Sequence, residues 1–206
     1  MTASTSPPIS SALTLASGSS IRRRILEDAG VPHRVQTRTL DEDALKAALL
    51  ADHLRPREIA DALAEAKSVA VSAREPGLVI GADQVLVIDG RIHDKPRDRS
   101  EARARLELLR GREHKLLGAT VVSEGGRAVW RNLSQTRLVM RNFSDAFLES
   151  YLDAEGEAAL QSVGAYRFEG PGAQLFTEVE GDFFAVLGLD LLPLLDYLRV
   201  RGVLAS

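Results

Sequence analysis

The segment that decides the fold is Leu78-Val79-Ile80-Gly81-Ala82-Asp83-Gln84-Val85-Leu86-Val87-Ile88. It is dense in β-branched and aliphatic residues, a composition that is typical of a buried strand. Asp89-Gly90 follows at once, and this pair favours a tight hairpin turn before Arg91-Ile92. We therefore expect a long buried strand that leads directly into a hairpin.

Two polar residues, Asp83 and Gln84, interrupt this strand directly after Gly81-Ala82. An ionised carboxylate in a buried strand is costly unless it is paired or bound to a metal. The small residues before it leave room for another group to approach the backbone. A structural aspartate that caps a neighbouring loop is the alternative, but the desolvation cost favours a functional role for Asp83.

The rest of the chain alternates between helical and strand patterns, and its central strands are consecutive. Two long strands, at 114–122 and 128–141, are joined by Glu124-Gly125-Gly126. Shorter strands are expected near residues 14–16, 33–37, 175–176 and 183–187, and helices near 21–29, 40–50, 56–70, 99–110, 145–153 and 191–200. This order predicts one α/β domain with a mixed β-sheet and flanking helices, not a doubly wound parallel sheet.

The composition is that of an ordinary globular protein, with 206 residues of which 45% are hydrophobic and 27% charged. A chain of this length lies at the upper end of the single-domain range and can bury a sizeable core. Because it has no cysteine, disulfides, thiolate metal sites and cysteine nucleophiles are excluded. The formal net charge of −3 gives no general attraction to nucleic acid or to an anionic membrane. Any anion site must therefore be a local concentration of charge.

Residues 1–11 are rich in Thr, Ser and Pro and lack the charged-then-apolar pattern of a signal peptide. We expect a disordered extension there and one folded domain over residues 12–206. No apolar run approaches the roughly 18–20 residues that a membrane span requires. These features predict a cytoplasmic protein with neither a membrane nor a nucleic acid as its partner.

A second informative stretch is Thr14-Leu15-Ala16-Ser17-Gly18-Ser19-Ser20-Ile21-Arg22-Arg23-Arg24. It predicts a short strand, a turn of small residues and a helix start, where free backbone N–H groups and the helix dipole favour an anion. The arginines add planar, bidentate donors that suit phosphate oxygens. A capped surface helix with solvated arginines would show the same residues, so the assignment depends on partners elsewhere in the chain.

Two lysines and three carboxylates are the candidate partners: Lys67, Lys95, Asp41 or Glu42, Asp83 and Glu169. Carboxylates beside phosphate-binding cations commonly hold Mg²⁺, which takes one or two of them together with phosphate oxygens. The combination suggests metal-assisted attack of water on a phosphoryl group, with a carboxylate as the proton acceptor.

An ordered set of motifs resembles the Maf family of nucleoside triphosphate pyrophosphatases over residues 13 to about 202. The motifs are Leu15-Ala16-Ser17-x-Ser19-x-x-Arg22-Arg23, Gly81-Ala82-Asp83, Lys95-Pro96, Gly111-x-x-His114, Gly164-Ala165-Tyr166 and Val186-x-Gly188-Leu189. The resemblance implies hydrolysis of a nucleoside triphosphate to a monophosphate and pyrophosphate with a divalent cation, Mg²⁺ or Mn²⁺. It also implies the Maf and ITPase-like fold, an elongated mixed sheet with a cleft between two lobes, often as a homodimer.

The resemblance also implies roles for individual residues. Asp83 matches the proton acceptor that activates water, and Glu42 matches an acidic residue near the metal, so that Glu42 and Asp83 form the implied metal site. The implied phosphate-binding residues are Ser17, Arg22, Arg23, Lys67 and Lys95.

Three positions follow substrate choice in the family, and this chain has Ile21, Gln84 and Glu169 there. Gln84 and Glu169 are similar to the branch that acts on 7-methyl-GTP. A carboxylate suits that base because methylated guanine is cationic, and Phe168 or Tyr166 are candidates to stack on it, although either residue can equally be core.

The chain departs from the family pattern at Ser20, at Gln161-Ser162 and at Asp190. These departures leave two alternatives to a pyrophosphatase for 7-methyl-GTP or another modified nucleotide. One is a dTTP/UTP pyrophosphatase, and the other is a nucleotide-binding regulator of cell division that has no turnover.

Overall fold

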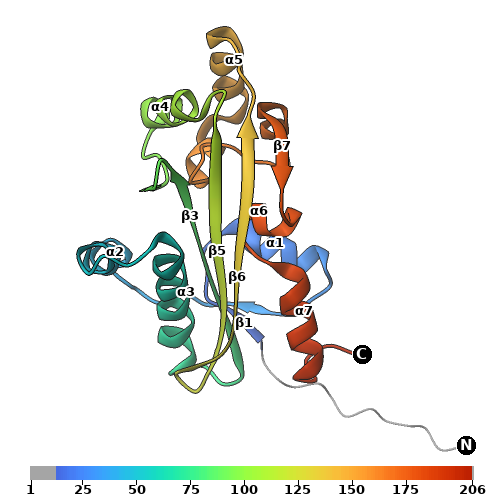
Figure 1. Cartoon of the computed structure of the whole chain (residues 1–206). Coiled ribbons are helices and arrows are strands. Elements are labelled where there is room, and N and C mark those ends of the chain that lie inside the picture. The colour runs from blue at the N-terminus through green and yellow to red at the C-terminus, as the bar shows by residue number, and fades with distance from the viewer. Residues whose placement is uncertain (1–12, 206) are drawn as a thin grey trace, which may run out of the picture.

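The computed structural model describes residues 13–205, so the extension predicted over residues 1–11 lies outside the described residues. The elements in chain order are β1 Leu13–Leu15, α1 Ser20–Asp28, β2 Arg34–Val35, α2 Glu42–Ala51, α3 Pro56–Ser72, β3 Leu78–Ile88, β4 Arg91–His93, α4 Arg99–Leu109, β5 Glu113–Glu124, β6 Arg127–Met140, α5 Asp145–Glu155, the 3₁₀ helices η1 Gly156–Gln161 and η2 Pro171–Leu175, β7 Phe176–Glu180, α6 Phe183–Val186 and α7 Leu191–Val200 (Figure 1). Among residues 13–205, no helix is both long and apolar enough to cross a membrane.

A single mixed sheet runs through the molecule in the order β2-β1-β3-β5-β6-β7. Strand β1 pairs in parallel with β2 and β3, whereas β3, β5, β6 and β7 follow one another antiparallel. The short strand β4 forms the predicted hairpin with β3. The long strands β3, β5 and β6 stand at the centre of Figure 1. The predicted α/β class and mixed sheet are therefore confirmed.

One face of β3 carries two hydrophobic cores, one above the other along the strand. Leu78, Ile80 and Ala82 belong to the core that α1 and α7 cover, called the lower core below. Leu86 and Ile88 belong to the core beneath α4 and α5, called the upper core. Side chains at every second position share a face of a strand, so one strand supports both lobes of the elongated fold.

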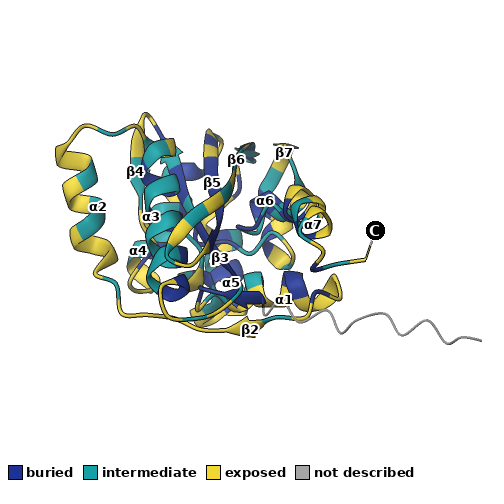
Figure 2. Cartoon of the chain, turned by 90° about the horizontal axis from the view of Figure 1, so that it is seen from below, coloured by how far each residue is buried: buried dark blue, intermediate teal, exposed yellow. Residues whose placement is uncertain are grey.

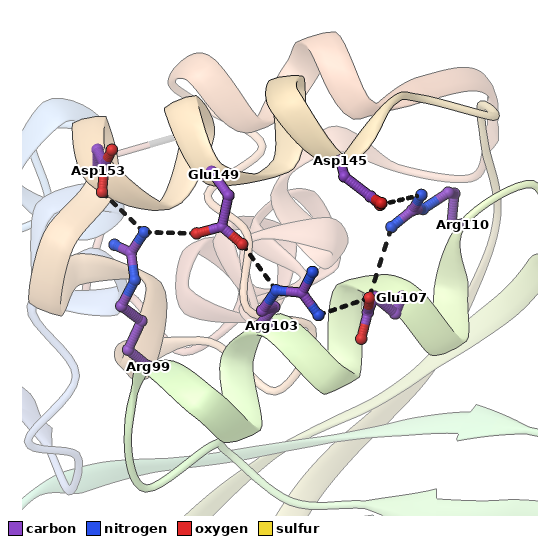
Figure 3. Close-up of polar contacts among 7 residues, drawn as sticks. All are labelled: Arg99, Arg103, Glu107, Arg110, Asp145, Glu149 and Asp153. Carbon is purple, nitrogen blue, oxygen red and sulfur yellow. Dashed lines mark hydrogen bonds and ion pairs between the residues drawn. The ribbon is translucent and has the colours of Figure 1, made fainter.

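The upper lobe is the part of the protein around α4 and α5, at the top of Figure 1. It carries a surface network of ion pairs between these two helices (Figure 3). Arg103 contacts Glu149 and Glu107, at 2.7 and 2.6 Å, while Arg99 reaches Glu149 and Asp153 at 2.9 and 2.7 Å. Exposed pairs of this kind contribute about 0–1 kcal/mol each. The network therefore fixes how the two helices face each other, and the core beneath them supplies most of the stability.

The segment 183–187 corrects the sequence prediction, because it forms helix α6 and not a strand. The Asp182 side chain accepts a hydrogen bond from Ala185 N at 2.9 Å and caps the helix start. Gly188, at a φ of +97°, ends it. The apolar run looks like a strand, but the cap and the glycine decide for a single helical turn.

Helix α3 packs very closely on the opposite face of β3, where Gly81 lies. A Cβ atom at Gly81 would stand 2.2 Å from Ala64 O and 2.8 Å from Ser68 N. A side chain at this position would therefore push the helix off the strand. This close approach also sets the position of Lys67, which lies on the same helix between those two residues.

We predict that Gly81→Ala destabilises the protein by about 3 kcal/mol, because the new methyl group overlaps backbone atoms that cannot move independently. Urea unfolding followed by circular dichroism measures the change in the free energy of unfolding. Gly18→Ala is the matched control, since no atom lies within 4 Å of a Cβ there. An unfolding midpoint for Gly81→Ala equal to that of the control would contradict the close packing.

A buried hydrogen bond in the upper core joins His114 Nε2 and the Tyr166 hydroxyl at 2.8 Å. Both residues are almost fully buried, with exposed fractions of 1% and 4%. Tyr166 is therefore a core residue and not available to stack on a ligand. Burial lowers the pKa of His114 from 6.5 to about 4, because the imidazolium would lose its hydration there.

His114 makes the stability depend on pH. Between pH 6.5 and about 4 the unfolded state binds the proton and the folded state does not, so stability falls as the pH falls through this window. We predict that His114 lowers the free energy of unfolding by about 2 kcal/mol between pH 7.5 and pH 5. Urea unfolding of wild type and His114→Gln at both pH values isolates it. An identical pH dependence in the two proteins would refute the prediction.

Candidate active site

The turn before α1 is built around Arg22. The Ser19 side chain caps the helix by accepting from Arg22 N at 3.4 Å. The Arg22 guanidinium donates to Ala82 O at 2.9 Å, to Gly188 O at 2.7 Å and to Ser17 Oγ at 3.3 Å. Among residues 13–205 its Nη2 atom makes no hydrogen bond, so one donor group is left for a ligand.

Lys67 joins two carboxylates on the α3 face of β3. Its Nζ atom lies 2.7 Å from Asp83 Oδ1 and 2.7 Å from Glu42 Oε2. The side chains of Lys67 and Asp83 are largely buried, with exposed fractions of 15% and 12%, whereas that of Glu42 is half exposed at 49%. Lys67, one of the candidate partners named from the sequence, therefore lies beside Asp83 and Glu42.

Glu42 reaches this cluster from a helix that is otherwise exposed. Helix α2 has no buried residue, and it stands apart from the sheet in Figure 2. Asp41 caps the helix by accepting from Ala44 N, so that Glu42 and not Asp41 is directed at Lys67. Lys46 on the same helix pairs with Asp94, which precedes Lys95 in the chain. This pair connects α2 with the loop that carries the second lysine.

The charges of these groups act on one another. The pKa of Lys95 is lowered, first by partial burial and then by the positive charges of Arg22 and Lys67. Burial also lowers the pKa of Arg22, while Asp83 and Glu42 act in the opposite direction. Lys95 therefore belongs to the same cluster as Arg22 and Lys67. An anion with several charges would relieve the mutual repulsion of these cations.

One hollow borders the turn before α1 and a second lies along α1 itself. The smaller, of about 80 Å³, is lined by Ser17, Gly18, Glu42 and Lys67 among others. The larger, of about 330 Å³, is mainly apolar; its lining includes Ile21, Glu169, Phe183, Phe184 and Leu187. The polar and charged hollow suits a phosphate group, and the apolar hollow suits a flat apolar group.

The structure does not bring every predicted residue to this place. Arg23 is exposed and lies 3.5 Å from Glu27 on the outer side of α1, away from Lys67. Gln84 lies on the opposite face of β3 from Asp83, as neighbouring residues in a strand do. Arg24 is exposed and pairs with Asp28, yet both residues line the larger hollow.

Phe183 and Phe184 were missed by the sequence analysis, which took their segment for a strand. Both belong to α6 and line the larger hollow, and the Phe183 side chain is 48% exposed. Asp182 before them and Gly188 after them were the available signals for a short helix. Phe168 lies 6.0 Å from Phe183 between ring centroids and packs against the upper core.

The donor set fits a divalent cation only in company with a ligand. Among residues 13–205, no three His, Asp or Glu side chains gather as a complete metal site. Glu42 and Asp83 both face Lys67, and two carboxylates are what Mg²⁺ takes from a protein when phosphate oxygens and water supply its other ligands. The residues therefore fit a metal that arrives with a phosphorylated substrate.

Comparison with known proteins identifies the family of this chain. The family model described as Maf-like protein matches residues 12–201. A nucleoside triphosphate pyrophosphatase of Caulobacter vibrioides is 54% identical over 192 residues, which are 93% of this chain and 96% of the relative. Proteins of the same name from Paramagnetospirillum magneticum and Hyphomonas neptunium are 52% and 48% identical, over 92% and 96% of this chain and 98% and 100% of the relatives. Matches of this extent show that the chain belongs to the Maf family.

Proposed function

We propose that this protein, a nucleoside triphosphate pyrophosphatase, hydrolyses its substrate at the cluster of Asp83, Lys67 and Glu42. The relatives that carry this activity in their names match nearly the whole chain. The observation that carries the proposal is the largely buried Lys67–Asp83 pair beside a helix start that offers free backbone donors. The bond that is broken joins the α- and β-phosphates, and the products are a nucleoside monophosphate and pyrophosphate.

Each residue of the cluster has a role in this hydrolysis. Asp83 accepts the proton of the attacking water through a carboxylate oxygen. Lys67 and Lys95 bind phosphate oxygens and offset the charge that shifts onto the departing pyrophosphate. A divalent cation, Mg²⁺ or Mn²⁺, held by Glu42 and Asp83 would neutralise further phosphate charge.

The turn before α1 binds the triphosphate in this proposal. Ser17 lines the charged hollow, Arg22 supports it through its bond to Ser17 Oγ, and backbone N–H groups at the helix start are the further donors. Arg23, by its place on the outer side of α1, has the weakest support among the proposed phosphate ligands.

The substrate that suits the larger hollow best is 7-methyl-GTP or another modified purine nucleotide. Its base would lie against Ile21, Phe183 and Phe184, with Glu169 at the rim. A methylated guanine carries a positive charge, which a carboxylate attracts and an aromatic ring accommodates. The protein would then remove modified nucleotides in the cytoplasm, as a monomer or as a homodimer.

The decisive experiment is a pyrophosphate-release assay on a panel of nucleotides with Mg²⁺ or Mn²⁺, and with EDTA as the metal-free control. We expect pyrophosphate and monophosphate in equal amounts, the highest kcat/KM for 7-methyl-GTP, and no turnover with EDTA. Release of orthophosphate would reject the reaction, and a preference for dTTP or UTP would reject the substrate.

Replacing Asp83, the proposed proton acceptor, tests the catalytic step. Asp83→Asn is expected to lower kcat about 10³-fold, because the amide cannot accept the proton of water, while the dissociation constant for nucleotide stays within a factor of about three. Stopped assays and calorimetry measure the two quantities. Asp89→Asn, an exposed turn residue, is the matched control and keeps full activity. Wild-type turnover by Asp83→Asn would exclude it as the base.

Replacing Glu169, the carboxylate at the rim of the larger hollow, tests whether the protein recognises a cationic nucleobase there. Glu169→Gln keeps the size of the side chain and removes its charge, so kcat/KM for 7-methyl-GTP should fall about tenfold relative to GTP. The control is Glu157→Gln, another exposed glutamate, which should leave the ratio unchanged. An unchanged ratio in Glu169→Gln would show that the cationic base is recognised elsewhere.

A further inference from the structure

We propose that Gln84 is a positioning residue that shapes the nucleobase hollow by holding α6 in place, and that it does not contact the base. This inference rests on the proposed function, since it takes the larger hollow to be the base site. The resemblance already links position 84 to substrate choice; the inference here is that Gln84 acts on it indirectly, through α6.

The hydrogen bonds of Gln84 carry the inference. Its Nε2 atom donates to Ala185 O at 2.8 Å and to Val186 O at 3.3 Å. An amide nitrogen has two hydrogens, and both are therefore engaged by the backbone of α6. Gln84 has no donor left for a base, and the two carbonyl groups that it contacts lie in the chain between Phe184 and Leu187, which line the hollow.

Arg22 holds the same segment from the opposite side. Its Nε atom donates to Gly188 O at 2.7 Å while its Nη1 atom donates to Ala82 O on β3. A Cβ atom at Gly188 would stand 3.3 Å from Arg22 Nη2, and the φ of +97° there favours glycine. The segment from Ala185 to Gly188 is therefore tied to β3 by a side chain from the strand and by one from α1.

Helix α6 needs such ties, because it is a single turn of four residues. A helix this short has no stability of its own and depends on tertiary contacts. The end of α6 contacts both cores, since Val186 packs in the upper core and the next residue, Leu187, packs against the lower core. Gln84 lies between these two cores on β3, at the point where α6 crosses from one to the other.

The position of α6 decides the shape of the hollow. Phe183 and Phe184 form its wall on the α6 side, and Ile21 and Ile25 line it from α1. If Gln84 is lost, Val186 O loses its donor and Ala185 O keeps only its bond from Gly188 N, so α6 must shift or admit water to satisfy the buried carbonyl group. The aromatic wall then moves relative to α1, and the base loses contacts while the triphosphate keeps its own.

Two variants separate positioning from direct contact. Gln84→Ala removes the donors, and Gln84→Glu keeps the acceptor oxygen but replaces the donor nitrogen by a second acceptor oxygen, which repels the carbonyl groups of Ala185 and Val186. We expect both to weaken 7-methyl-GTP binding about tenfold and to leave tripolyphosphate, which has no base, within a factor of about two. Calorimetry in an Asp83→Asn background measures both constants without turnover. Gln174→Ala, an exposed glutamine, is the matched control.

Two results would overturn the inference. If Gln84→Glu keeps the affinity of Gln84 while Gln84→Ala loses it, the side chain accepts a hydrogen bond from the base directly. If nucleotide and tripolyphosphate weaken together, the residue supports the whole site and not the base hollow. Turnover by the otherwise unaltered protein is measured apart from these constants, so failure of the pyrophosphatase reaction is recognised separately.

Hydrogen exchange tests the hold on α6 without any ligand. The amides of Val186 and Gly188 donate within this turn, at 3.1 Å each, to Asp182 O and Ala185 O. Gln84→Ala should make the peptide covering residues 183–190 exchange about tenfold faster, with β5 unchanged. Exchange equal to that of the unaltered protein would overturn the inference. As a second check, Gln84→Ala combined with Phe184→Leu should weaken nucleotide binding less than the two single effects together.

Discussion

The alternation of side chains along β3 is the constraint on which the rest of the structure depends. Asp83 faces α3 and its lysine, and Gln84 faces the side of α1, α6 and α7. Because adjacent residues in a strand point to opposite faces, one dipeptide can serve a charged hollow and an apolar one. A shift of one residue in the register of β3 would exchange the two faces and destroy both.

Burying charged groups on the α3 side of β3 costs free energy, and the contacts of these groups offset the cost. Lys67 and Asp83 are mostly removed from water, which costs several kcal/mol for each ion unless partners replace the hydration. Lys67 has two carboxylate partners at 2.7 Å, and the absence of a side chain at Gly81 lets α3 bring it there. Under the proposed function, this fixed arrangement lowers the cost of reorganisation when a triphosphate binds.

The sequence was sufficient for the features that local chemistry determines. The bounds of β3, its hairpin and the functional role suggested for Asp83 all follow from a buried run interrupted by a carboxylate and closed by Asp-Gly. The character of α6 did not follow, because its apolar residues also fit a strand. The local signals, Asp182 and Gly188, are short, and the distant partners Gln84 and Arg22 add contacts that the sequence order does not reveal. The triple arginine was equally ambiguous: residues 22 and 23 are neighbours in sequence but lie about 100° apart around a helix, so only one faces the sheet.

Arg22 joins elements that border the two hollows. Its guanidinium touches the turn that borders the charged hollow, the strand that carries Asp83 and the segment that carries the aromatic wall. One guanidinium therefore joins the end of α6 to β3 and to the turn before α1. Since a guanidinium offers five donors in a rigid plane, the three contacts fix its orientation. With Arg22 held in this way on the turn, Gln84 remains the side chain that ties the body of α6 itself to β3, through Ala185 O and Val186 O.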